Sequence, residues 1–203
     1  EEISGRDIKR IHQVPVRFTE SERAVYTKAI EEFHVMRSNY FASTGNSRKD
    51  SMMRLIQQIT LLLRISAAPN TIREYDGGLP TKIAKVIEML QSMDGEIVAV
   101  GVRHKVVVDA YAKAIREIMP DRPLFVVTGS TTTLAKRRAL RKILKESKNG
   151  ILLCTQQSLP SSVSFEYVDK VIIPELHYNN SRMSQFYMRF IRFTSERMKD
   201  IYF

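Results

Sequence analysis

Cysteine is nearly absent from this chain of 203 residues, because Cys154 is the only one. A single cysteine excludes an internal disulfide and a structural zinc site of the cysteine type. The four histidines, His12, His34, His104 and His177, show no metal-ligand spacing. We therefore interpret each histidine as structural or solvated, and the sequence predicts no metal site in this chain.

Glycine-rich phosphate-binding loops are also missing. No GxGxxG segment follows a predicted strand, which argues against a dinucleotide-binding site. No GxxxxGK[ST] segment occurs either, so the chain cannot by itself hold a nucleoside triphosphate as a complete P-loop enzyme does. No GxSxG segment supports a serine hydrolase, although a triad assembled from distant residues stays open.

Long hydrophobic runs are absent as well. The apolar stretch ITLLLRISAA, residues 59–68, is interrupted by Arg64 and is much shorter than a membrane span. The first residues, EEISGRDIKR, do not resemble a signal peptide. We therefore expect a soluble, intracellular protein with no membrane contact. The abrupt ends at Glu1 and Phe203 suggest a part of a longer chain.

Positive charge is in excess. The chain has 32 Lys and Arg residues against 22 Asp and Glu residues, which gives a net charge of +10 and a pI near 9.8. This excess favours polyanionic partners such as nucleic acid or nucleotide phosphates. The length suffices for one large domain, or for a domain with an appendage.

The first third of the chain has a helical pattern. Residues 19–36 and 48–65 show helical signals, with Thr19 as a predicted N-cap and the turn-like segment ASTGNS between them. We therefore predict a helical segment over residues 1–74.

From residue 75 onward, short β-branched runs alternate with helical segments. The predicted helices cover residues 81–93, 105–119, 133–147 and 181–193, and the predicted strands cover residues 96–102, 123–129, 150–155 and 170–175. Such alternation is typical of parallel strands covered by helices on both faces. The sequence thus predicts an α/β domain over residues 75–203.

In an open parallel sheet, ligands bind outside the carboxyl ends of the strands. The predicted strands end in the segments GVRH, TGST, TQQS and PELHYNN. Ser130 and Thr131 could donate hydrogen bonds to phosphate oxygens, with Gly129 allowing close backbone approach, or could instead cap the next helix. The basic run over residues 136–142 is either a solvated helix face or, in a nucleic-acid-binding domain, a phosphate-facing patch.

The segment SQFYMRFIRF, residues 184–193, is apolar except for a few polar positions. In a helix, Gln185, Arg189 and Arg192 would fall within an arc of roughly 60°, at about 100° per residue. A buried helix with this single polar stripe presents its guanidinium groups to an anion or to a buried carboxylate. The alternative is an amphipathic helix with a solvated basic edge.

The order of these motifs resembles the C-terminal RecA-like lobe of Swi/Snf-type ATPases, which are DNA translocases of helicase superfamily 2. Their signature V-I-x-x-D-x-x-W-N-P is followed, after four residues, by Q-x-x-x-R-x-x-R. This chain has VIIPELHYNN at 171–180 and then Gln185, Arg189 and Arg192 at the same intervals. The segments ILLCT, FVVTGST, TKIAKVIEML and TESERAVYTKAI resemble further family elements, so the resemblance extends over residues 8–203.

The chain departs from the family pattern at several positions. Glu175 and Tyr178 stand where the family has Asp and Trp, and Thr194 and Ser195 replace a Gly-Gln pair. The glycine-rich turn of the family is here QQSLPSSVSF, which contains Pro160 and no glycine. We therefore interpret the chain as a divergent member in which nucleotide or DNA approach to this turn is in question.

The resemblance implies a role in ATP hydrolysis. Arg189 and Arg192 would meet the γ-phosphate of ATP, which with Mg²⁺ would be bound mainly by the N-terminal RecA-like lobe of the same protein. Gln185 would align the nucleotide or its attacking water. The full-length protein is then expected to be an ATP-dependent DNA helicase or translocase, and the isolated chain is expected to be inactive.

The resemblance also implies contacts with double-stranded DNA through its backbone, without sequence specificity. Arg103, Ser130, Thr131 and Thr155, at three strand ends, are the expected DNA-binding residues. The alternative function is a nucleic-acid-binding or regulatory module that kept the fold without ATPase activity. The altered turn after Thr155 favours this alternative, whereas the retained arginines oppose it.

Overall fold

A computed structural model describes residues 9–129, 133–159, 165–176, 180–191 and 197–203. Its contacts divide the chain into two compact units. One unit consists of Glu1–Pro15 together with Lys85–Phe203, and the other of Val16–Ala84. The sequence placed the division between residues 74 and 75 and assigned the N-terminal residues to the helical part.

The first unit is built on a six-stranded parallel sheet with the strand order β1-β6-β5-β2-β4-β3. All five strand pairings are parallel, which confirms the predicted sheet type. The strands are β1 (Lys9–His12), β2 (Val98–Val102), β3 (Leu124–Val127), β4 (Ile151–Thr155), β5 (Lys170–Ile172) and β6 (Lys199–Tyr202).

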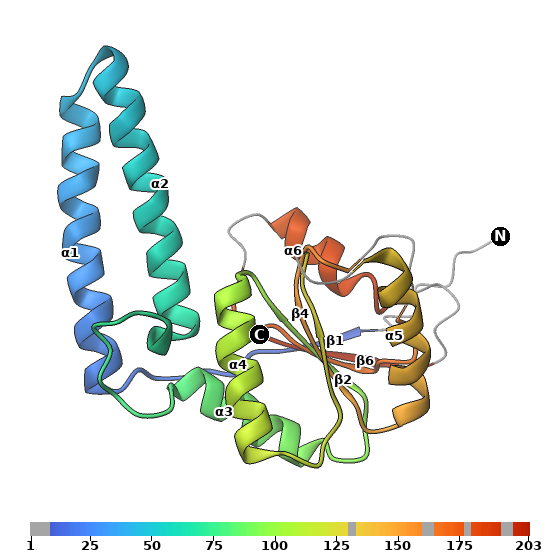
Figure 1. Ribbon diagram of the computed structural model, residues 1–203. Helices are drawn as coiled ribbons and strands as arrows, with labels where there is room; N and C mark the ends of the chain where they lie inside the picture. Colours follow the sequence, from blue (N-terminus) through green and yellow to red (C-terminus); the bar gives the residue numbers. More distant parts are fainter. Residues whose placement is uncertain (1–8, 130–132, 160–164, 177–179, 192–196) are drawn as a thin grey trace. The chain divides into compact units, whose positions relative to one another are not determined.

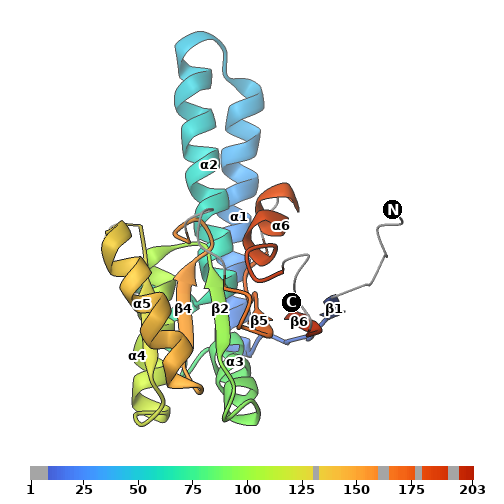
Figure 2. The same cartoon turned by 90° about the vertical axis from the view of Figure 1, so that its right-hand side faces the viewer.

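Helices cover both faces of this sheet, as the sequence predicts. Figures 1 and 2 show α3 (Thr81–Ser92) and α4 (Lys105–Ile118) on one face, and α5 (Leu134–Ser147) and α6 (Asn180–Tyr187) on the other. Strands β2 and β4 are buried along their whole length, which explains their continuous apolar sequences. On the α5 and α6 face, a buried cluster joins Leu144, Leu152, Cys154, Phe186 and Phe190.

The second unit is a helical hairpin. Helices α1 (Glu20–Ala42) and α2 (Gly45–Ala67) lie side by side, and the 3₁₀ helix η1 (Pro69–Thr71) follows (Figure 1). The connection is only two residues long, and Gly45, at a φ of 57°, takes a left-handed conformation that favours glycine. Gln58 Nε2 links the helices by donating to Ala29 O at 2.8 Å and to Glu32 Oε2 at 3.2 Å.

Glu22 connects the start of α1 to the start of α3. The predicted cap at Thr19 is confirmed as a capping box, in which Thr19 N donates to Glu22 Oε2 at 2.7 Å and Glu22 N donates to Thr19 Oγ1 at 3.3 Å. Glu22 Oε1 also accepts from Thr81 N at 2.8 Å, and the Thr81 hydroxyl donates to the same carboxylate. One buried carboxylate therefore satisfies donors at two helix starts.

We expect Glu22→Ala to lower the free energy of unfolding by about 3 kcal/mol, because the backbone N–H groups of Thr19 and Thr81 both lose the buried carboxylate that accepts their hydrogen bonds. Urea unfolding followed by circular dichroism measures the change. The matched control is Glu20→Ala, since Glu20 is exposed in the same helical turn, and it should change stability by no more than about 0.5 kcal/mol. Equal effects of the two substitutions would contradict the role assigned to Glu22.

Strands β1 and β6 were not predicted from the sequence. Both are four residues long and carry charges, and they pair with each other in parallel register, with Ile11 opposite Ile201. Lys199 is buried in β6, where its Nζ lies 2.6 Å from Asp169 Oδ1 and donates to Glu166 O and Val168 O. A charged residue that is buried with its own partners gives no apolar pattern, so such a strand escapes periodicity analysis.

Candidate functional site

Three neighbouring strands bring polar residues together at their carboxyl ends. Arg103 follows β2, Gln156 follows β4 and Glu175 lies three residues beyond β5. Because β2 pairs with both β4 and β5, these residues share one edge of the sheet. A hollow of about 180 Å³ opens at this edge, lined by Arg103, His104, Gln156, Gln157 and Arg182. We refer to these five residues as the strand-edge pocket.

Glu175 organises the base of the strand-edge pocket. The side chain is only 1% exposed, and Oε2 accepts from Arg103 N at 2.8 Å. His104 Nε2 lies 3.6 Å from Oε1. The Glu175 charge also acts on the buried Tyr111. Burial raises the pKa of the Tyr111 hydroxyl above its ordinary value, and the Glu175 charge adds a smaller increase. Glu175 therefore fixes the turn between β2 and α4, which carries Arg103 and His104.

Gln156 holds β4 to its neighbours. Its Nε2 donates to Glu175 O at 2.9 Å and to Gly101 O at 3.2 Å, and its backbone N donates to Val102 O at 2.8 Å. Gln156 Oε1 is buried and has no hydrogen-bond partner among the described residues. The pocket thus combines a rigid frame with an acceptor that a bound group could use.

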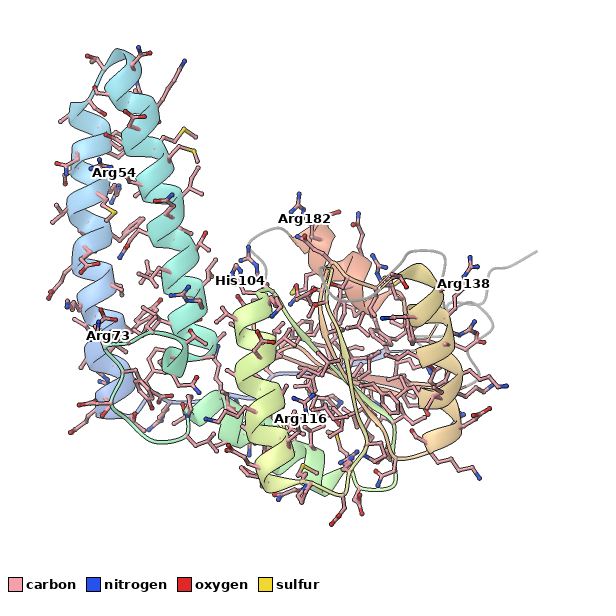
Figure 3. The ribbon with its side chains drawn as sticks, viewed as in Figure 1. Arg54, Arg73, His104, Arg116, Arg138 and Arg182 are labelled. Atoms are coloured by element: carbon pink, nitrogen blue, oxygen red, sulfur yellow. The ribbon has the colours of Figure 1, made fainter. Side chains whose placement is uncertain are left out.

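Basic side chains line the strand-edge pocket. Figure 3 shows His104 at the start of α4 and Arg182 at the start of α6 at the same edge of the sheet unit, whereas Arg116 lies toward the other end of α4. Arg182 is exposed, and Arg103 and His104 are half-buried. Two arginines and a histidine that are at least partly exposed on a rigid frame suit an anionic ligand such as a phosphate group.

Thr155, predicted to contact DNA, is buried at the end of β4. Its hydroxyl is hydrogen-bonded to the Ser158 hydroxyl, and Ser158 N donates to Thr155 O at 2.9 Å. In this conformation Thr155 shapes the turn that positions Gln156 and Gln157. To contact a phosphate, the Thr155 hydroxyl would have to give up its hydrogen bond to the Ser158 hydroxyl.

The helix predicted over residues 181–193 ends earlier than expected, at Tyr187. Arg189 N donates to Phe186 O at 3.2 Å and Phe190 N to Tyr187 O at 3.0 Å, so the chain tightens into a turn. Arg189 O then accepts from Phe165 N at 3.2 Å, and the Phe190 side chain is buried. The prediction of one continuous helix face through Arg189 is therefore wrong, because Phe190 turns into the core.

Arg189 nevertheless lies beside Gln185, as its spacing predicts. Its Nε donates to Gln185 O at 3.2 Å, while Nη1 is buried without a hydrogen-bond partner among the described residues. Burial lowers the pKa of this guanidinium below its ordinary value, and the neighbouring Cys154 acts in the opposite direction. No carboxylate in the described part of the chain forms an ion pair with Arg189.

Several predicted residues lie outside the described residues, namely Ser130, Thr131 and Arg192. The cap of α5 is Thr133, whose hydroxyl accepts from Lys136 N at 3.3 Å. Arg182, Gln156 and Gln157 were not singled out from the sequence. The two glutamines follow a predicted strand directly, so the strand-end rule that selected Thr155 could have found them. Nothing in the pattern around Arg182 distinguishes it from other surface arginines.

Two further searches of the described residues concern metals and membranes. No three His, Cys, Asp or Glu side chains gather closely enough there to hold a metal ion. None of the helices in the described ranges is long and apolar enough to span a lipid bilayer.

Comparisons with known proteins identify the fold. No family model matches the sequence, and no curated protein matches it. The Sulfolobus solfataricus SWI2/SNF2 ATPase core in complex with dsDNA is similar with a TM-score of 0.74 and 15% identity, over 96% of this chain and 40% of that one. The C-terminal part of the Fun30 ATPase domain has a TM-score of 0.68 and 13% identity, over 96% of this chain and 83% of that one.

A more distant similarity is to domain 2 of the DEAD-box helicase Mss116p bound to an RNA duplex. Its TM-score is 0.50 at 17% identity, over 60% of this chain and 49% of that one. The chain spans 40% of the length of the Sulfolobus ATPase core that it matches. Taken with the parallel sheet and its helices, these similarities show the fold of the C-terminal RecA-like lobe of Swi2/Snf2 ATPases.

Proposed function

We propose that this chain, which has the fold of the C-terminal lobe of a Swi2/Snf2 ATPase, is the second motor lobe of an ATP-dependent DNA translocase. In this role it supplies an arginine for phosphoryl transfer and a set of contacts to the DNA backbone. The observation that carries the proposal is Arg189, a partly buried guanidinium with one nitrogen unpaired among the described residues.

A buried arginine without a carboxylate partner costs free energy, because its charge has lost water without gaining a counter-charge. Such a cost is common where a site is prepared for an anionic ligand. Planar guanidinium groups hold phosphate oxygens by two parallel hydrogen bonds and stabilise the charge of the transferred phosphoryl group. Arg189 fits this task. We assign the alignment of the nucleotide or its attacking water to Gln185, whose backbone O accepts a hydrogen bond from Arg189 Nε at 3.2 Å.

The nucleotide itself requires groups that this chain does not carry. The sequence contains no phosphate-binding P-loop, and the described residues hold no carboxylate cluster suited to Mg²⁺. We propose that an N-terminal RecA-like lobe of the same protein binds Mg-ATP. Closure of the two lobes would bring Arg189 to the γ-phosphate, and hydrolysis would release it.

The strand-edge pocket is the proposed DNA contact. Arg103, His104 and Arg182 present donors at the carboxyl ends of the strands, where they could hold backbone phosphates without reading base sequence. The double-stranded DNA in the Sulfolobus complex makes duplex DNA the first ligand to test. The net charge of +10 adds a favourable long-range attraction.

Binding of the isolated chain to duplex DNA tests this proposal. We expect the affinity to be independent of sequence and to fall steeply with salt, because bound phosphates release counterions. Arg182→Gln should reduce the slope of log affinity against log salt by about 0.9, the value for one lost phosphate contact. Fluorescence anisotropy of a labelled duplex over a range of salt concentrations measures both quantities.

The matched control is Arg116→Gln, because Arg116 is exposed but lies toward the opposite end of α4 from His104 (Figure 3). Its salt slope should equal that of the unmodified chain. A salt-independent affinity, or equal slopes for all three proteins, would show that the strand-edge pocket does not bind the DNA backbone.

A further inference from the structure

A second pocket lies entirely within the helical hairpin unit. It has a volume of about 340 Å³ and is formed by α1, α2 and the residues around η1. Its apolar wall consists of Val25, Ala29, Leu61, Ile65 and Ile72. A pocket of this size with apolar walls is in the range that binds small organic groups. None of its residues belongs to the sheet unit that carries the proposed motor functions.

Charged side chains line the rest of this hairpin pocket. Three are cations, Lys28, Arg64 and Arg73, and two are carboxylates, Glu32 and Glu74. No side-chain ion pair or hydrogen bond joins these cations to any described residue, although two carboxylates line the same space. Glu32 instead accepts from Gln58 Nε2 at 3.2 Å. The pocket therefore has one positive charge in excess.

Arg64 is the least satisfied of these groups. Its Nε is buried and has no hydrogen-bond partner among the described residues. Arg64 is in the last turn of α2, where a positive charge interacts favourably with the helix dipole. That interaction explains a cation at this position but leaves the buried Nε–H of Arg64 without an acceptor among the described residues, which is unfavourable. An anionic acceptor inside the pocket would remove this cost.

We propose that the hairpin pocket binds a monoanion, a carboxylate carried on a short apolar body. The carboxylate accepts hydrogen bonds from Arg64, and the apolar body contacts Leu61, Ile65 and Ile72. A single negative charge matches the excess of one positive charge, whereas a polyphosphate would be repelled by Glu32 and Glu74. The same chemistry is available from a free small acid or from a leucine next to a glutamate in a peptide.

Nuclear magnetic resonance of the arginine Nε–Hε groups tests this proposal directly. The ¹⁵N-labelled chain is titrated with hexanoate, with uncharged hexanamide, and with the peptide acetyl-Leu-Glu-amide. We expect hexanoate or the peptide to shift the Arg64 Nε–Hε resonance in a saturable manner, and hexanamide to leave it in place. Whichever acid binds more tightly identifies the source of the ligand.

Two variants separate specific binding from general charge effects. Arg64→Gln should weaken binding by about tenfold or more, the loss expected for one charged hydrogen bond. Arg54→Gln, which removes an exposed arginine from the same helix, should leave binding unchanged (Figure 3). If Arg64→Gln does not fold, the contrast between hexanoate and hexanamide on the unmodified chain decides alone. Absence of a saturable shift with both acids, or equal shifts with hexanamide, would overturn the proposal.

Discussion

Replacement of Arg189 by alanine should reduce ATP turnover by the complete two-lobed protein by about 10³ to 10⁵, the range for arginines that act on a transferred phosphoryl group. ATP binding should change little, because the proposed mechanism assigns most contacts to the nucleotide to an N-terminal lobe. The structural basis is the guanidinium itself, which is partly buried and has one nitrogen unpaired among the described residues. Phosphate release gives the turnover, and equilibrium binding of a fluorescent ATP analogue gives the affinity.

The stability of the chain distinguishes this role from a structural one. Arg189 makes one described side-chain hydrogen bond, to Gln185 O, so Arg189→Ala should change the free energy of unfolding by no more than about 1 kcal/mol. An arginine held in a buried ion pair would instead cost about 3 to 5 kcal/mol when removed. Arg116→Ala, at an exposed position on α4, is the control and should affect neither turnover nor stability. Large destabilisation with unchanged turnover per folded molecule would make Arg189 structural.

Arg192 supplies a second test of the same step. The resemblance assigns both arginines to one phosphoryl group, and residues that act as a unit have non-additive effects on rate. The double variant should therefore lose little more activity than either single variant. If the rate loss of the double variant instead equals the product of the two single losses, the arginines act independently.

Gly101→Ala should destabilise the sheet unit by about 3 kcal/mol, at the upper end of the range for an overfilled core. A Cβ at residue 101 would lie 2.3 Å from two atoms of the buried Phe186 ring, so this ring, or α6 that carries it, would have to shift away from β2. Displacement of α6 would also move Gln185, which lies on α6, and Arg189, which follows it. We therefore expect Gly101→Ala to weaken the ATP hydrolysis that is assigned to Gln185 and Arg189, as well as the stability of the sheet unit.

Cys154 provides a convenient readout of this effect. It is opposite Gly101 in the register of β2 and β4, it is fully buried, and burial raises the pKa of its thiol to about 12. A thiol reagent can reach Cys154 only when the sheet opens. A loss of 3 kcal/mol corresponds to a labelling rate roughly 100-fold higher, when opening and closing are fast relative to labelling.

A control and a rescue make the Gly101 result specific. Gly129→Ala should not change the labelling rate much, because its Cβ would meet only Ser158 Oγ at 3.8 Å, an ordinary contact. Adding Phe186→Leu to Gly101→Ala should recover part of the stability, since the two residues occupy the same space. Unchanged Cys154 labelling in Gly101→Ala would show that α6 tolerates the extra methyl group.

The sequence predicted the central strands well, because β2 and β4 are buried on both faces and read as continuous apolar runs. It failed where charged groups are buried with their own partners. Lys199 is enclosed in β6 by Asp169 and by backbone carbonyl groups, and Arg122 is buried against the carbonyl groups of Leu90, Met93 and Glu96. Lys199 and Arg122 can be buried only because partners distant in the sequence satisfy their charges, and hydrophobic periodicity does not reveal such partners.

The candidate site shows a similar division. Motif spacing indicated Gln185 and Arg189, and the structure places them next to each other although the helix ends between them. Spacing could not reveal that Phe190 turns into the core, since an apolar residue in a helix face and one in a turn look alike. Nor could it reveal Arg182, which reaches the strand-edge pocket only because α6 begins at that edge.

DNA-dependent ATP hydrolysis by the complete protein, compared with that of this 203-residue chain alone, is the decisive measurement. A second motor lobe predicts turnover that duplex DNA stimulates in the complete protein, with background hydrolysis by the isolated chain in the presence or absence of DNA. Arg189→Ala should abolish the stimulated rate while DNA binding persists. DNA binding by the complete protein without any stimulated hydrolysis would contradict the proposal, and would instead indicate a nucleic-acid-binding module that kept the fold and lost the motor.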